Sequence, residues 1–114
     1  MLITILPAGS QDSQSGSTTT NSDALRSENF GFKLGNIGFQ VITTGFNAAD
    51  ATVALEHSND GTNWSTVADS TLTLASGSAN QCMILTNQAF AWYRVAFVKG
   101  SNSAGTFQVI LNFN

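Results

Sequence analysis

The sequence predicts an all-β protein: an antiparallel β-sandwich, jelly-roll or immunoglobulin-like, with an N-terminal extended arm. From residue 28 onward, apolar and polar residues alternate with a period of two, which is typical of half-buried strands. Strand-sized runs are separated by turn-rich segments, and the chain has one Pro and ten Gly. No stretch has the period of a long amphipathic helix. We therefore expect a strand and flexible Ser/Thr/Gln-rich arm over residues 1–27 and a sandwich domain over residues 28–114.

The N-terminal segment has the composition of a strand on a tether. Met1 to Leu6 is a β-prone apolar run that ends at Pro7, and Ala8 to Ser22 contains no large apolar residue. Such a strand could pair with a sheet edge of its own subunit or of a neighbour. Alternatively, it is an ordinary first strand followed by a long surface loop. The arm residues expected to make an interface are Leu2, Ile3 and Ile5.

The remaining strands follow from the alternation. We expect one strand over residues 30–33, a tight turn at Gly35-Asn36 and a second strand over residues 37–41. Later strand-sized runs are residues 52–57, 65–68, 72–74, 82–86, 92–99 and 106–113. The predicted core is Phe30, Phe32, Ile37, Phe39, Val41, Val53, Leu55, Trp64, Leu72, Leu74, Ile84, Tyr93, Val95, Phe97, Phe107, Val109, Leu111 and Phe113.

A hairpin turn is the strongest local signal. Asp60-Gly61 lies between two alternating runs, and Gly61 can adopt the positive φ that closes such a turn. Asp60 is expected to accept a hydrogen bond from a backbone N–H two residues later. Trp64 then enters the next strand as a large side chain that fills the core. These three residues are predicted to fasten the hairpin to the core.

The same residues carry a resemblance to a known class of proteins. The pattern S-x-D-G-x-x-W, followed later by Trp92-Tyr93-Arg94-Val95, resembles small β-sandwich domains in structural proteins of tailed bacteriophages. The resemblance covers about half of the chain, from residue 51 to residue 98. Those domains occur as capsid decoration or cement proteins and in head fibres, necks and tails. The resemblance implies a virion protein that is made in the host cytoplasm and binds major capsid or other virion proteins.

Composition narrows the possible partners. The net charge is −3, and the four bases, Arg26, Lys33, Arg94 and Lys99, form no stripe that could neutralise phosphates, so nucleic-acid binding is not expected. No run is long enough for a transmembrane helix, and residues 1–6 lack the features of a signal peptide, so no membrane partner is expected. Only 10% of the residues are charged, and such a neutral surface suits a packed assembly.

The outward residues of two strands suggest an interface. If Tyr93, Val95 and Phe97 point inward, Trp92 and Val98 point outward, and Ile110 points outward on the last strand. A half-apolar outer face is usually covered by something, such as another subunit. We therefore predict a homo-oligomer, with a trimer as the expected state because capsids offer threefold positions. The interface residues predicted on the strands are Trp92, Arg94, Val98 and Ile110.

The chain offers little for catalysis or metal binding, and we expect no enzyme, no cofactor and no metal. His57 is the only histidine, and Glu56 beside it points to the opposite face of the strand, so His57 is expected to be half-buried and bonded to a backbone group. Residues 59–63 supply a single carboxylate, too few for a calcium site. Cys82 is the only cysteine, which excludes an intrachain disulfide, and is expected to be a small buried residue.

Glycan or receptor binding is the main alternative. Sandwich modules can bind sugars by stacking an exposed aromatic ring on the sugar and surrounding it with amide groups. D-G-x-x-W hairpins also occur in discoidin-like sugar-binding and adhesion sandwiches. An enzyme accessory domain is a third, weaker interpretation. The residues that could form a sugar site are Trp64, Trp92 and Tyr93, with Asn59, Asn63, Asn87 and Gln88.

Overall fold

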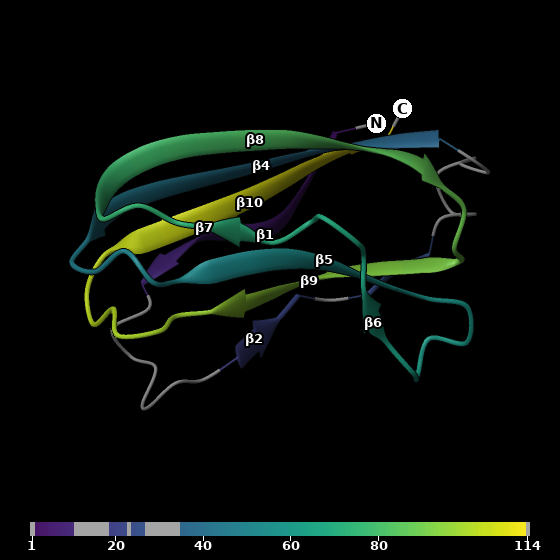
Figure 1. Cartoon of the computed structure of the whole chain (residues 1–114), viewed down its shortest axis with the longest axis horizontal. Helices are drawn as coiled ribbons and strands as arrows, with labels where there is room; N and C mark the ends of the chain where they lie inside the picture. Colours follow the sequence, from purple (N-terminus) through teal and green to yellow (C-terminus); the bar gives the residue numbers. More distant parts are fainter. Residues whose placement is uncertain (1, 11–18, 23, 27–34, 114) are drawn as a thin grey trace.

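The computed structural model describes residues 2–10, 19–22, 24–26 and 35–113, and these residues form two packed antiparallel sheets (Figure 1). The described residues contain no helix, and hence none that is long and apolar enough to cross a bilayer. The strands are β1 (Leu2–Ser10), β2 (Thr19–Asn21), β3 (Leu25–Arg26), β4 (Gly35–Phe46), β5 (Thr52–Ser58), β6 (Ser65–Thr66), β7 (Leu72–Thr73), β8 (Gly77–Gln88), β9 (Trp92–Val98) and β10 (Thr106–Phe113).

The strand order is that of a jelly roll. One sheet has the order β1-β10-β4-β8, and the other has the order β2-β9-β5-β6, with β3 added to β9 and β7 added to β5. If the short strands β3 and β7 are left out, the pairs are nested from the ends of the chain inward. They are β1 with β10, β2 with β9, β4 with β8 and β5 with β6. This nested pairing closes two Greek keys. The predicted β-sandwich is confirmed.

The core lies between the sheets and follows the alternation of the sequence. On β9, Tyr93, Val95 and Phe97 are fully buried, while the residues between them are half-buried on the outside. Phe97 stacks on Phe107 of β10, with ring centroids 4.0 Å apart. Phe30 and Phe32 lie outside the described residues. The predicted core residues that the structure buries are Ile37, Phe39, Val41, Val53, Leu55, Leu74, Tyr93, Val95, Phe97, Phe107, Val109, Leu111 and Phe113.

Strand β8 is longer than predicted, and it turns toward the core the side chains that the prediction had placed outside. Pairing with β4 extends the strand over the polar residues 77–81. Ile84 was predicted to lie in the core, but its side chain is 73% exposed, whereas Leu85 is buried. Residues 82–85 are four consecutive apolar residues, so the sequence pattern does not show which of them point toward the core.

The beginnings of two strands also differ from the prediction. Gly35 and Asn36 were predicted to form a tight turn, but they are the first residues of β4, with a register shift between Gly35 and Ile37. Strand β1 does not stop at Pro7 but continues to Ser10, with a register shift between Leu6 and Gly9. An edge strand tolerates a proline because its outer side needs no ladder donor.

Both N-terminal segments pair with strands of the same chain. Leu2 pairs with Asn112 and Ile3 with Leu111, so β1 forms the edge of the β1-β10-β4-β8 sheet. Further along, the Ser22 amide donates to the Val95 carbonyl at 2.9 Å, and the Val95 amide donates to the Ser22 hydroxyl at 2.8 Å. Of the two possibilities for the first strand, the structure thus shows pairing within its own subunit.

Candidate functional site

The Asp-Gly turn after β5 is built as the sequence predicted. One carboxylate oxygen of Asp60 accepts the amides of Thr62 and Asn63 at 2.9 and 2.8 Å, and the other accepts the Asn63 side-chain amide. Gly61 has φ +74°, the left-handed region that favours glycine. The Ser58 hydroxyl accepts the Gly61 amide at 3.0 Å. These donors stabilise the ionised carboxylate and hold the pKa of Asp60 well below its ordinary value.

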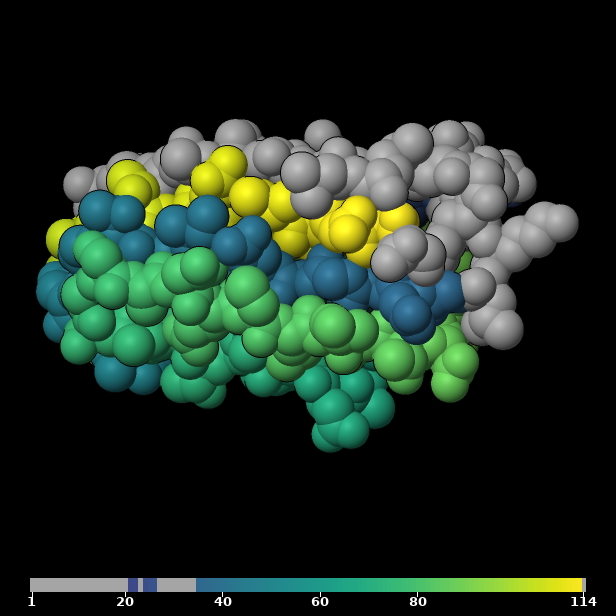
Figure 2. Space-filling model, turned by 90° about the horizontal axis from the view of Figure 1, so that it is seen from above, coloured from purple at the N-terminus to yellow at the C-terminus, as the bar shows by residue number. Residues whose placement is uncertain are grey.

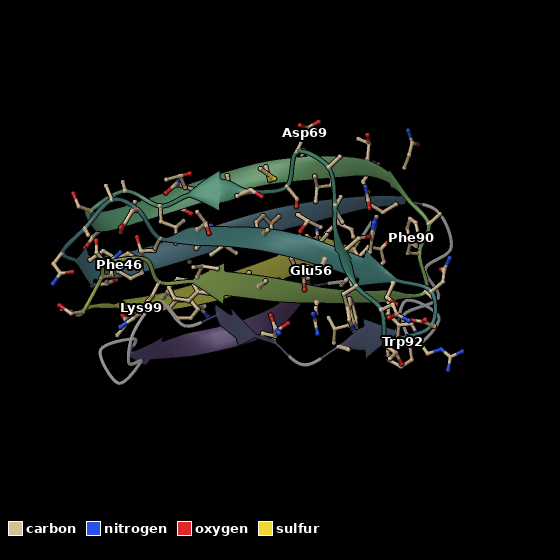
Figure 3. The ribbon with its side chains drawn as sticks, turned by 60° about the horizontal axis from the view of Figure 1, so that its bottom comes forward. Phe46, Glu56, Asp69, Phe90, Trp92 and Lys99 are labelled. Atoms are coloured by element: carbon tan, nitrogen blue, oxygen red, sulfur yellow. The ribbon has the colours of Figure 1, made fainter. Side chains whose placement is uncertain are left out.

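The tip of this turn packs against Trp92. A Cβ atom at Gly61 would lie 3.1 Å from Cε2 of the Trp92 ring, so the ring and the turn backbone are in close contact. The guanidinium of Arg26, which is opposite Trp92 in the ladder, lies 5.3 Å from the ring centroid. The Asn59 side chain also accepts the Ala91 amide at 3.1 Å. Trp92 is therefore half-buried by groups of its own chain (Figure 3).

Trp64 does not fill the core, contrary to the prediction. It lies half-buried on the outside, where the Arg94 guanidinium sits 4.3 Å from its ring centroid. Val67 is buried instead. Positions 64 and 67 differ by an odd number, so a regular strand cannot turn both side chains inward.

Arg94 connects Trp64 to a carboxylate. Arg94 and Glu56 are directly opposite each other on β9 and β5, and Nε of Arg94 lies 2.6 Å from Oε1 of Glu56. Both side chains are about four-fifths buried, with exposed fractions of 24% and 19%. Arg94 therefore stacks on Trp64 and pairs with a carboxylate of its own chain.

These residues share one outer surface, which we call the charged face. It is the outer side of the β2-β9-β5-β6 sheet, and every charged residue of the described strands that points outward belongs to it: Arg26, Glu56 and Arg94. Trp64 and Trp92 lie on this face, each with a guanidinium over its ring. A guanidinium in a cation–π contact covers one of the two faces of a ring, so each indole is already partly occupied by its own chain.

The outer side of the other sheet is different, and we call it the uncharged face. The strands β1, β10, β4 and β8 contain no Asp, Glu, Lys, Arg or His. Figure 2 looks onto this side, where β8, β4 and β10 lie next to one another in green, blue and yellow. Its described residues near the middle of the sheet include Gly38, Gln40, Ile42, Cys82, Ile84, Ile110 and Asn112.

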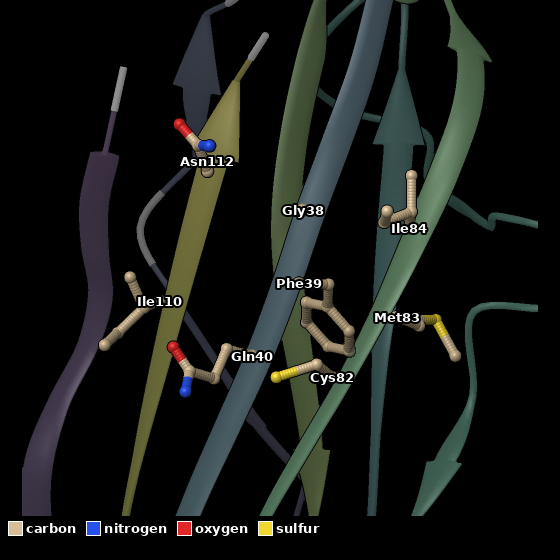
Figure 4. Close-up of a pocket in the computed structure, with 8 residues that line it drawn as sticks. All are labelled: Gly38, Phe39, Gln40, Cys82, Met83, Ile84, Ile110 and Asn112. Carbon is tan, nitrogen blue, oxygen red and sulfur yellow. The ribbon is translucent and has the colours of Figure 1, made fainter.

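An open groove of about 600 Å³ crosses the uncharged face. Gly38 on β4 is paired with Asn112 on one side and with Ile84 on the other, so the row of side chains is interrupted at the glycine (Figure 4). In the neighbouring row, Gln40 is paired with Ile110 and Cys82, and its amide donates to Asn80 at 2.8 Å. The missing side chain of Gly38 leaves a local hollow in the floor of this groove.

The predicted interface residues are divided between the two faces. Trp92, Arg94 and Val98 lie on the charged face, as the alternation of β9 predicts, whereas Ile110 lies on the uncharged face. The structure therefore does not bring Ile110 together with the other three. Leu2, Ile3 and Ile5 belong to β1, at the edge of the sheet that carries the uncharged face. Sequence reasoning missed Gly38, although a glycine in the middle of a strand was a visible signal.

Two single residues also differ from expectation. Cys82 is exposed, not buried, because it points outward from β8. His57 is half-buried as predicted, with its ring centroid 3.9 Å from that of Phe90, but its Nδ1 is buried and has no partner in the described part of the chain. Burial lowers the pKa of His57 because it disfavours the charged form. No three metal-ligating side chains come together among the described residues.

The solved structures that resemble this chain are β-sandwich domains of two kinds. The carbohydrate-binding module CBM36, in complex with calcium and xylotriose, superposes with a TM-score of 0.50 at 12% identity, over 100% of this chain and 99% of that one. The infectious bursal disease virus VP2 subviral particle gives a TM-score of 0.49 at 16% identity, over 100% of this chain and 32% of that one. At 12% identity, the likeness to the carbohydrate-binding module shows the fold alone. No protein-family model matches the chain, and no curated protein does.

Proposed function

We propose that this chain is a non-enzymatic structural protein of a bacteriophage virion, specifically a capsid decoration protein. The observation that carries the proposal is the uncharged face: a sheet of four strands without a charged residue, on which Ile84 is 73% exposed. Burying a charge in an interface costs desolvation, so a face without charges can be covered at low cost. The resemblance of the Asp-Gly hairpin to phage structural proteins and the jelly-roll fold support the same role.

The proposed mechanism is adhesive. Many copies bind neighbouring capsid or other virion subunits through the uncharged face, and the symmetry of a capsid multiplies individually weak contacts. The predicted contact of Leu2, Ile3 and Ile5 is part of this proposal, because β1 is the edge strand of the same sheet. In this role the charged face supports the hairpin, since its two tryptophans are already in contact with groups of their own chain.

The proposal is tested on particles of the phage that encodes the chain. Gradient-purified particles are analysed by peptide mass spectrometry, and the copy number of the chain is compared with that of the major capsid protein. We expect the chain in the particle fraction at a fixed ratio. A chain that is found only in the soluble fraction of the lysate contradicts the virion role.

A glycan-binding module is the second candidate, favoured by the two tryptophans, Arg94 and Glu56 on the charged face. Sugar binding on the covered face of either ring requires Arg26 or Arg94 to leave that ring. Trp64 and Trp92 are the only tryptophans, so their fluorescence reports directly on this face. Titration with xylotriose, cellohexaose and galactotriose is expected to leave the fluorescence unchanged. A saturable change that Trp64→Phe or Trp92→Phe abolishes favours the glycan-binding module instead.

A further inference from the structure

Ile84 is an exposed apolar side chain at a position where the strand could equally carry a polar residue. It lies near the middle of the second half of β8 and is 73% exposed, whereas its neighbour Leu85 contributes to the core. Nothing in the fold requires an aliphatic residue at position 84, because the outward positions before it, Ser78 and Asn80, are polar. Ile84 lines the same groove as Ile110, and it is such a grouping of apolar side chains, not a single one, that is typical of a contact surface.

Gly38 is a glycine that the fold of the single chain does not require. It lies in β4, between β10 and β8, where glycine weakens a strand. It is not among the glycines with positive φ. A Cβ atom at this position would meet Asn112 Cβ at 3.5 Å, an ordinary van der Waals contact. In a central strand, such a glycine often marks a place where another molecule approaches closely.

We propose that the uncharged face binds a second copy of this chain across a two-fold axis, with Ile84 of each copy seated over Gly38 of the other. Ile84 and Gly38 are directly paired, so their Cα atoms are about 5 Å apart on adjacent strands. An axis that runs between β4 and β8, parallel to them, exchanges the two positions. The protruding Ile84 side chain of one copy then meets the hollow at Gly38 of the other, twice.

The chemistry of the groove favours a second copy over a small polar ligand. The groove is flanked by Ile84 and Ile110, none of the described residues that line it is charged, and the Gln40 amide already donates to Asn80. The surface that must cover it therefore has to be apolar and uncharged, and the same face of another copy meets both conditions. No like charges oppose each other when two such faces meet.

The position of the axis sets the size of the contact. Because β8 is the edge strand, an axis between β4 and β8 brings only these two strands of each copy face to face, and β10 and β1 stay outside the contact. Two strands of 12 residues, about 4.8 Å apart, cover about 400 Å² per copy, which is less than the roughly 800 Å² per partner of a standard interface. A weak dimer is therefore expected, one that forms only toward millimolar concentration. The two-fold contact rests on the proposed assembly role for its biological use, and it replaces the predicted trimer as the smallest unit of self-association.

The test is the solution mass of the full chain by sedimentation equilibrium, from micromolar to millimolar concentration. The native chain is expected to rise from 12.0 kDa to twice that mass. Gly38→Val fills the hollow with a residue that strands favour, and Ile84→Lys places a charge in the contact; both variants are expected to remain at the mass of one chain. Thr66→Lys, at an exposed position of β6 in the other sheet, is the matched control and is expected to dimerise as the native chain does.

Circular dichroism and thermal melting show whether each variant is folded. If Gly38→Val does not fold, the mass of Ile84→Lys alone tests the two-fold contact. A native chain that keeps the mass of one chain at millimolar concentration overturns the contact, as does a Gly38→Val or Ile84→Lys variant that dimerises like the native chain. The virion role and the two-fold contact can fail independently. If the chain binds to particles but stays monomeric in solution, only the two-fold contact is overturned. If the chain forms dimers but is absent from particles, only the virion role is overturned.

Discussion

At the scale of single residues, the Asp-Gly hairpin shows how a short motif fixes both a turn and a contact. Gly61 needs its positive φ to close the turn, and it needs the absence of a Cβ atom to let the Trp92 ring approach. The first requirement could be predicted from the Asp-Gly pair. The second could not, because Trp92 comes from a distant strand.

Substitution of two glycines separates these requirements. Gly77 also has a positive φ, +82°, but nothing lies within 4 Å of a Cβ atom built on it. Gly77→Ala should therefore lower the free energy of unfolding by the backbone strain alone, about 1–3 kcal/mol. Gly61→Ala should lower it further, because the added methyl group displaces the Trp92 ring. Urea denaturation measures both values, and equal losses would contradict the packing of the ring on the turn.

Acid should weaken the fold in two separate pH ranges. Burial lowers the pKa of His57 below its ordinary value of 6.5, so the unfolded chain takes up this proton first and stability falls as the pH drops below 6.5. Hydrogen bonds lower the pKa of Asp60 and Asp50 below 3.8, so their contribution, present above that pH, is lost as the pH falls further.

The variant His57→Phe tests the first range. It replaces a buried ring nitrogen that has no described partner by an apolar ring edge beside Phe90. Its melting temperature should be unchanged between pH 7 and pH 5, whereas that of the native chain falls, and both proteins should lose stability below pH 4. A native-like fall above pH 5 in the variant would show that another group titrates there.

At the scale of the strand, β8 shows where sequence patterns stop being informative. Alternation placed β9 and β10 correctly because Arg94 in β9 and Gln108 and Asn112 in β10 interrupt the apolar residues. In β8 the run Cys82 to Leu85 has no polar residue, and residues 77–81 are polar enough to resemble a loop. Its true length and inward side are set by pairing with β4, which is a tertiary contact.

Two neighbouring alanine substitutions test the inward side of β8. Leu85→Ala removes a buried side chain and should lower the free energy of unfolding by about 2–5 kcal/mol. Ile84→Ala removes a largely exposed one and should change it by no more than about 0.5 kcal/mol in dilute solution. Denaturant unfolding at micromolar concentration provides both values, and the reverse order would mean that β8 turns its other side to the core.

At the scale of the whole molecule, the charges are distributed unequally between the two faces. The β-sandwich and most of its core could be predicted from alternation and turn residues. The separation of a charged from an uncharged face could not, because it depends on which strands share a sheet. Ile110 and Trp92 both point outward in the sequence pattern, yet the jelly-roll order places them on opposite sides.

The proposed adhesive role rests on this separation, because only the uncharged face can be covered without burying a charged residue of its strands. A surface contact on one face should be sensitive to a charge placed there and insensitive to the same charge on the other face. Ile84 and Thr66 provide such a pair of exposed positions, one in each sheet.

The most direct measurement is the occupancy of Ile84→Lys and Thr66→Lys on particles that lack the native chain, determined by quantitative mass spectrometry after gradient purification. We expect Thr66→Lys to bind at native copy number and Ile84→Lys to be lost from the particles while remaining folded in solution. Native occupancy of Ile84→Lys, or equal loss of both variants, would contradict an adhesive role of the uncharged face.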